Sequence, residues 1–180
     1  INHFSIPLWF YRRGAWEHPD SPRIFSDFVE KVVGELGGLV DYWITLNEPL
    51  VYAYQGYILG KWPPGKSDFY LCLKVIKNLI FAHVFSYEKI RLITRQKYSK
   101  TPRIGLSNHA IVFSPCNEKS LKDKFSAALR RNMANHFFIR SVMTGRVFIP
   151  GIFNEILPVK RAFDFIGINY YSRDFVRNIG

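Results

Sequence analysis

Hydrophobic and polar positions along the chain follow two alternating patterns, one typical of helices and one typical of buried strands. Apolar residues recur every three or four positions over residues 21–36 and 67–90, which predicts two amphipathic helices. A third helix is predicted over residues 120–145, where Ser120 and Asp123 have the spacing of a capping box.

Short runs of branched and aromatic residues lie between these helices and predict strands that are covered on both faces. They occupy residues 39–46, 103–107 and 163–171. His3 and Phe4 resemble the end of a further strand.

The alternation of strands and helices predicts the α/β class, with about four parallel strands joined by right-handed crossovers. We find no internal repeat or linker and therefore expect one domain over residues 1–180. Four strand ends and about three helices correspond to roughly half of an eight-unit barrel, for which ~250 residues is typical. The expected fold is an incomplete (β/α)8 TIM barrel.

Charge and composition argue against a nucleic-acid-binding or membrane-spanning protein. The chain has 25 Lys and Arg against 14 Asp and Glu, a formal charge of +11, but the basic runs fall on predicted helices and fit solvent-facing positions. We therefore expect no nucleic-acid partner. The apolar run 75–85 is interrupted by Lys77, Asn78 and His83, so no membrane span is expected. No secretory signal is visible, which favours a cytoplasmic location.

Glu48 is the strongest candidate for chemistry. It follows an apolar strand directly and is followed by Pro49, and the carboxyl ends of barrel strands are where such folds place their active sites. The neighbouring Asn47 carries both a donor and an acceptor and can hold a hydroxyl group. Composition alone favours a simpler interpretation, in which Glu48 caps the next segment.

Four segments together resemble glycoside hydrolase family 1, the β-glucosidase family. The sequence 40–49, VDYWITLNEP, resembles its acid/base motif, and segments 3–9, 56–65 and 164–172 agree in order and spacing. The resemblance covers almost the whole chain.

The resemblance implies a retaining β-glycosidase that acts on small β-linked saccharides and needs no cofactor or metal. It assigns Glu48 as general acid/base, Asn47 as a partner of the sugar 2-hydroxyl and His3 as a ligand of glycone hydroxyls. Tyr171 matches the tyrosine that orients the nucleophile, and Asn169 falls on the same strand end, facing the site. Asn108 is a weaker candidate, since a turn-forming role fits it equally well.

The second carboxylate of such a mechanism is not found in this sequence. A retaining glycosidase places two carboxyl groups ~5 Å apart, and the family nucleophile is a glutamate followed by Asn-Gly. None of the glutamates here precedes an asparagine. We therefore expect these residues alone to be inactive, and a non-catalytic sugar-binding or degenerate barrel module remains the alternative.

Three further expectations concern packing. Trp62, just before Pro63, is a candidate for the rim of the site, and His83, in mid-helix, is expected in the core. Ile44, Leu46 and Ile168 are expected to be poorly covered, because an open parallel sheet leaves its edges and one face unpaired.

Overall fold

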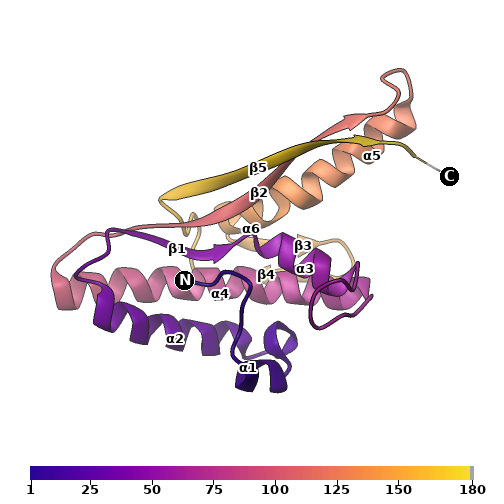
Figure 1. The fold of residues 1–180 in the computed structure, drawn as a ribbon. Coiled ribbons are helices and arrows are strands. Elements are labelled where there is room, and N and C mark those ends of the chain that lie inside the picture. The colour runs from indigo at the N-terminus through magenta and orange to yellow at the C-terminus, as the bar shows by residue number, and fades with distance from the viewer. Residues whose placement is uncertain (179–180) are drawn as a thin grey trace.

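A three-stranded parallel sheet forms the centre of the computed structural model, which describes residues 1–178. Its strands are β1 (Tyr42–Asn47), β2 (Arg103–Pro115) and β5 (Phe165–Val176), in the order β1-β2-β5. Helices α2 (Ser21–Leu36) and α4 (Phe69–Tyr98) lie side by side beneath β1 (Figure 1). The predicted α/β class with parallel strands is confirmed.

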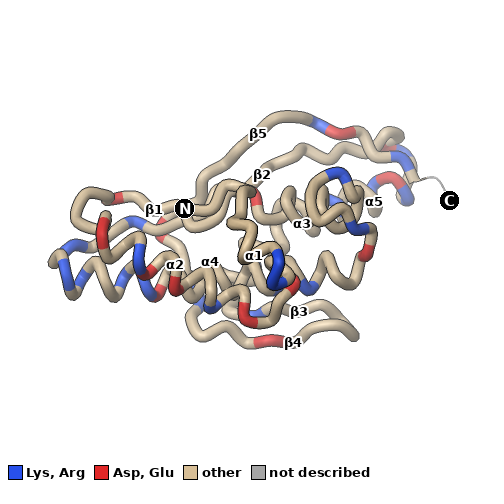
Figure 2. The backbone as a smooth tube through the Cα atoms, turned by 60° about the horizontal axis from the view of Figure 1, so that its bottom comes forward, with Lys and Arg blue, Asp and Glu red and all other residues tan. Residues whose placement is uncertain are grey.

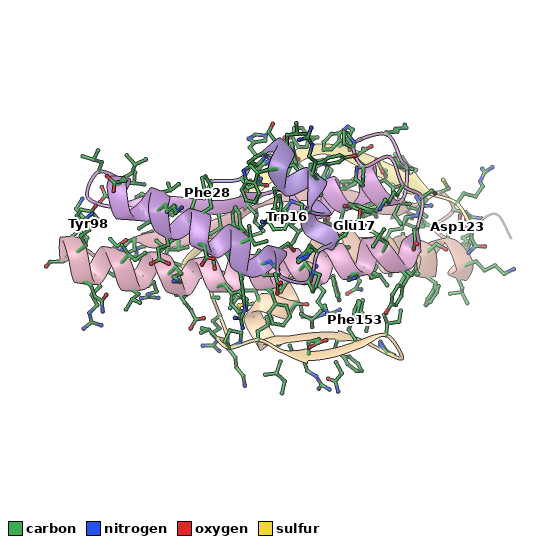
Figure 3. The ribbon with its side chains drawn as sticks, turned by 90° about the horizontal axis from the view of Figure 1, so that it is seen from below. Trp16, Glu17, Phe28, Tyr98, Asp123 and Phe153 are labelled. Atoms are coloured by element: carbon green, nitrogen blue, oxygen red, sulfur yellow. The ribbon has the colours of Figure 1, made fainter. Side chains whose placement is uncertain are left out.

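The remaining elements are short and connect or flank this sheet. They are α1 (Leu8–Arg12), η1 (Ala15–Glu17), α3 (Pro49–Tyr57), α5 (Leu121–Arg131), the π-helical turn η2 (Asn132–His136), α6 (Phe137–Thr144), β3 (Arg146–Ile149) and β4 (Phe153–Ile156). Strands β3 and β4 form an antiparallel hairpin that the sequence patterns did not predict. It lies along α4 on the side away from α2, with Phe153 on it (Figure 3).

Two details of the sequence prediction were wrong in extent. The helix expected over residues 120–145 is divided by η2 into α5 and α6. The strand end expected at His3 and Phe4 is at Asn2, which forms a parallel bridge with Leu46 and exchanges backbone hydrogen bonds with Thr45 and Asn47.

Strand β2 is much longer than predicted and β5 extends five residues further than predicted, and the two run side by side beyond the end of β1 (Figure 1). Asp164 fixes the start of this pair, since its backbone N–H donates to the Ile104 carbonyl at 2.7 Å and its Oδ2 accepts from the Ile104 N–H at 2.9 Å. The long pair carries polar side chains of both strands past the point where β1 stops.

The helix starts follow from capping. The Asp68 side chain accepts a hydrogen bond from the Leu71 N–H at 2.9 Å, and Ser120 accepts from the Asp123 N–H at 3.2 Å. Each side chain satisfies one of the backbone donors that a helix leaves open in its first turn. The Ser120 cap was predicted from sequence.

The main hydrophobic core lies between the sheet and helices α2, α4 and α6. His83 is fully buried in it, as expected: its Nδ1 is 2.6 Å from the Thr45 hydroxyl and its Nε2 is 2.8 Å from the Ala162 carbonyl. Ile44 and Ile168 are exposed, as expected, but Leu46 is 1% exposed. Leu46 belongs to the main hydrophobic core, so the prediction for this residue was wrong.

Helix α4 is long and apolar enough to cross a membrane, with a mean hydropathy of 1.4 over an 18-residue window. In the structure, 61% of that window is buried inside the protein. The helix packs along α2, with Trp16 near their contact (Figure 3). Its apolar character is therefore used in the protein core.

The charges are distributed rather than collected into one basic face. Lys and Arg occur on several helices, and along α2 they are interspersed with Asp and Glu (Figure 2). Described ion pairs such as Lys89 with Glu30 and Lys66 with Glu17 join neighbouring elements.

Candidate active site

Glu48 lies at the junction between β1 and α3 with a strained backbone. Its φ of 45° and ψ of 54° place it in the left-handed region, which non-glycine residues seldom adopt. Its N–H donates to the Ser107 carbonyl at 2.8 Å, and its carbonyl accepts from the Val51 N–H at 3.0 Å. Pro49 disfavours a right-handed helical conformation at Glu48, so α3 begins only after it. Strain of this kind, held by surrounding bonds, is common at functional sites.

The Glu48 side chain is buried, with the residue 6% exposed, and it joins a network of polar side chains. Asn169 Nδ2 donates to Glu48 Oε1 at 2.7 Å and lies 3.2 Å from Asn47 Oδ1. Ser107 Oγ donates to Asn169 Oδ1 at 2.8 Å. The network thus joins the end of β1 to residues within β2 and β5, and Asn169 is its central member.

Tyr171 completes the network from β5. The Glu48 carboxylate, hydrogen-bonded to the Tyr171 hydroxyl and negatively charged beside it, raises the pKa of Tyr171. The Tyr171 ring also lies against the His109 ring, with centroids 5.2 Å apart and planes inclined by 35°. The structure therefore brings together Asn47, Glu48, Asn169 and Tyr171, all of them sequence candidates.

His3 forms part of a short aromatic row. Its ring contacts Phe4 edge-on at 5.0 Å, and Phe4 contacts Trp62 at 4.9 Å. The backbone of Asn2, one residue before His3, is bonded to the end of β1. The backbone therefore brings His3 to the end of β1 that carries Asn47, while the described ring contact of His3 is with Phe4 rather than with the network.

Asn108 does not join the network. Its side-chain amide donates to the carbonyls of His109 and Asn135, at 3.0 and 3.5 Å, and is therefore turned toward η2. Successive side chains of a strand point to opposite faces, so Ser107 and His109 face the site where Asn108 cannot. The sequence analysis missed both residues, although this period of two was available to find them.

The described residues include no group of three or more His, Cys, Asp or Glu side chains placed to hold a metal ion. The network consists of one carboxyl group, two side-chain amides, one aliphatic hydroxyl and one phenol. Such a set can hold sugar hydroxyls and move a proton at the Glu48 carboxyl group.

The model of the family described as Glycosyl hydrolase family 1 matches residues 1–180. The chain belongs to this family. It is 27% identical over 190 residues to a 1,4-beta-D-glucan glucohydrolase of Thermotoga neapolitana, covering 98% of the chain and 43% of that protein. It is 26% identical over 190 residues to beta-glucosidase A of Thermotoga maritima, covering 98% and 41%. The chain thus spans less than half the length of these relatives.

Solved structures agree with this membership. A beta-glucosidase from Thermotoga maritima in complex with glucoimidazole superimposes with a TM-score of 0.85 at 25% identity, covering 97% of this chain and 41% of that one. A beta-glycosidase from Pyrococcus horikoshii superimposes with a TM-score of 0.82 at 29% identity, covering 95% and 38%. The family resemblance predicted from the sequence is confirmed.

Proposed function

We propose that this family 1 chain carries the acid/base half of a retaining β-glycosidase, built on part of a (β/α)8 barrel and acting on small β-linked glucosides or related saccharides. Glu48 is the general acid/base in this proposal. The observation that carries it is the buried Glu48 carboxyl group, held at a strand end by Asn169 at 2.7 Å beside the Asn47 amide.

The chemistry proceeds in two proton transfers. Protonated Glu48 gives its proton to the glycosidic oxygen as the bond from that oxygen to the anomeric carbon breaks. A second carboxylate, supplied from outside residues 1–180, forms the bond to the anomeric carbon. Ionised Glu48 then takes a proton from water, whose oxygen displaces that carboxylate and restores the starting state.

The surrounding residues bind and orient the sugar in this scheme. Asn47 holds the hydroxyl next to the bond that breaks, and His3 binds glycone hydroxyls. Asn169 orients the Glu48 carboxyl group, because its single amide nitrogen donates hydrogen bonds to both Glu48 and Asn47. Trp62 and Phe4 offer an aromatic surface at the rim.

Turnover tests the role of Glu48 in a polypeptide that contains both carboxylates. The Glu48→Gln variant should lower kcat/KM, which reports the first proton transfer and not the second, about 10²- to 10⁴-fold for a glucoside with a poor leaving group. The loss should be far smaller for an activated aryl glucoside, because a good leaving group needs no proton. Equal losses for both substrates would contradict the role of acid.

Ligand binding tests the site in the 180-residue chain itself. Deoxynojirimycin, which is bound in a solved Thermotoga maritima beta-glucosidase, carries an amine that a carboxylate attracts. We expect it to shift the side-chain amide NMR signals of Asn47 and Asn169, and Glu48→Gln should weaken this binding. Glu155→Gln, at the ion pair with Lys77, is the matched control. Binding that does not respond to Glu48→Gln would favour a non-catalytic sugar-binding module.

A further inference from the structure

Tyr171 is an extra residue in the pairing between β2 and β5. The register pairs Ala110 with Tyr170 and Ile111 with Ser172, so Tyr171 has no partner on β2. Such a bulge interrupts the ladder and redirects one side chain. Here that residue is the tyrosine whose ring lies against His109 and whose pKa is raised by the Glu48 carboxylate.

The backbone of β2 is held at this same point by a side chain of the π-helical turn. Asn135 Oδ1 accepts from the Ile111 N–H at 3.2 Å, and Asn135 Nδ2 donates to the Ile111 carbonyl at 2.7 Å. One amide thus satisfies both backbone groups of the residue at which the register shifts.

The Asn135 amide bonds a part of β2 that has no β1 partner. The pairing of β1 with β2 ends at Ser107, so the edge of β2 beyond it has no β1 partner. The Asn135 amide bonds Ile111 there as the backbone of a neighbouring strand would. A π-helical turn contains one residue more than the matching α-helical turn, and such turns are frequent at functional sites. Asn108 adds a bond of 3.5 Å to the Asn135 carbonyl.

We propose that Asn135 is a positioning residue: by clamping Ile111 it holds the register shift that directs Tyr171 at Glu48. The role of this contact in catalysis rests on the proposed function, whereas the hydrogen bonds between Asn135 and Ile111 do not depend on it. Without the clamp, β5 can slip by one residue, which would turn the side chains beyond the bulge to the opposite face. Tyr171 would then leave both Glu48 and His109.

Three variants test this in the 180-residue chain. Asn135→Ala removes both bonds to Ile111, and Asn135→Asp keeps the acceptor but removes the donor. Asn132→Ala is the matched control, because Asn132 lies in the same turn but donates to the Ala128 carbonyl at 3.2 Å. Tyrosine labelled with ¹³C at Cζ, assigned with Tyr171→Phe, reports the pKa of Tyr171 and its NOE to the His109 ring.

We expect Asn135→Ala to lower the pKa of Tyr171 toward its ordinary value of 10.0 and to abolish the NOE to His109. Asn132→Ala should change neither readout. If Asn135→Ala does not fold, the Tyr171 pKa and the NOE to His109 are measured on Asn135→Asp instead, with the same expectation. A folded Asn135 variant that keeps both would overturn the proposal. Because neither readout needs turnover, rejection of Glu48 as acid/base would leave this result intact.

Discussion

The side-chain amide of Asn169 on β5 donates a 2.7 Å hydrogen bond to Glu48 at the end of β1, although β2 lies between the two strands. The Ser107 hydroxyl of β2 bonds the other end of the same amide at 2.8 Å. The candidate site is therefore a bridge across the sheet, and its geometry depends on the register of all three strands.

Removing this bridge should destabilise the protein. Asn169→Ala leaves Glu48 without its donor and Ser107 without its acceptor, and we expect the free energy of unfolding to fall by about 1–3 kcal/mol. Urea denaturation measures it. Asn154→Ala, at an exposed position of the hairpin, should change it by less than about 0.5 kcal/mol. Equal effects of the two variants would argue against the bridge.

The buried His83 should make stability depend on pH. Burial lowers the pKa of His83 from 6.5 to about 4. Between these two pH values the unfolded chain binds a proton at this histidine and the folded protein does not. Stability contributed by neutral His83 is therefore present above pH 6.5 and lost as the pH falls to about 4. The loss amounts to about 3 kcal/mol, since each pKa unit corresponds to about 1.4 kcal/mol.

Denaturation of two histidine variants at pH 7 and pH 4 measures this contribution. His83→Leu should be less stable at pH 7, because Thr45 and Ala162 lose their partner, but should lose less stability on acidification than the original chain. His136→Gln, at an exposed histidine, should keep the original slope. The same slope in His83→Leu would show that His83 does not resist protonation.

Two glycines should respond to alanine in opposite directions. A Cβ at Gly105 would lie 2.4 Å from the Phe165 carbonyl oxygen, so Gly105→Ala must push β2 and β5 apart, at about 1–3 kcal/mol. Gly34 in α2 has open space around it, and Gly34→Ala should stabilise the helix by about 0.5–1 kcal/mol. Thermal melting of both variants gives the signs. A Gly105→Ala protein as stable as the original would mean the strands have room to separate.

The exposed apolar side chains of β5 should cause self-association of the 180-residue chain. Ile168 is 71% and Phe175 66% exposed, on a strand at the edge of the sheet. Sedimentation velocity should show oligomers that Ile168→Lys reduces. Leu121→Lys, at an equally exposed position on α5, should leave them unchanged. A monomer at all concentrations would contradict this prediction.

Part of the site was readable in the sequence because it depends on local order. An apolar strand that ends at Glu48 before Pro49 places a carboxyl group at the end of a strand, and the family motif over residues 164–172 places Asn169 and Tyr171 together on another strand. The helix boundary at Ser120 was readable for the same reason, since a cap acts within one turn.

The tertiary structure decided what depends on distant segments. The sequence determined the α/β class, the family and the position of Glu48, because hydrophobic period and motif spacing are properties of neighbouring residues. It could not show that Leu46 packs into the main hydrophobic core, or that β2 and β5 shift register at Tyr171. A register is a choice among pairings of similar local energy, and here the contact of Asn135 with Ile111, from 24 residues away, accompanies that choice.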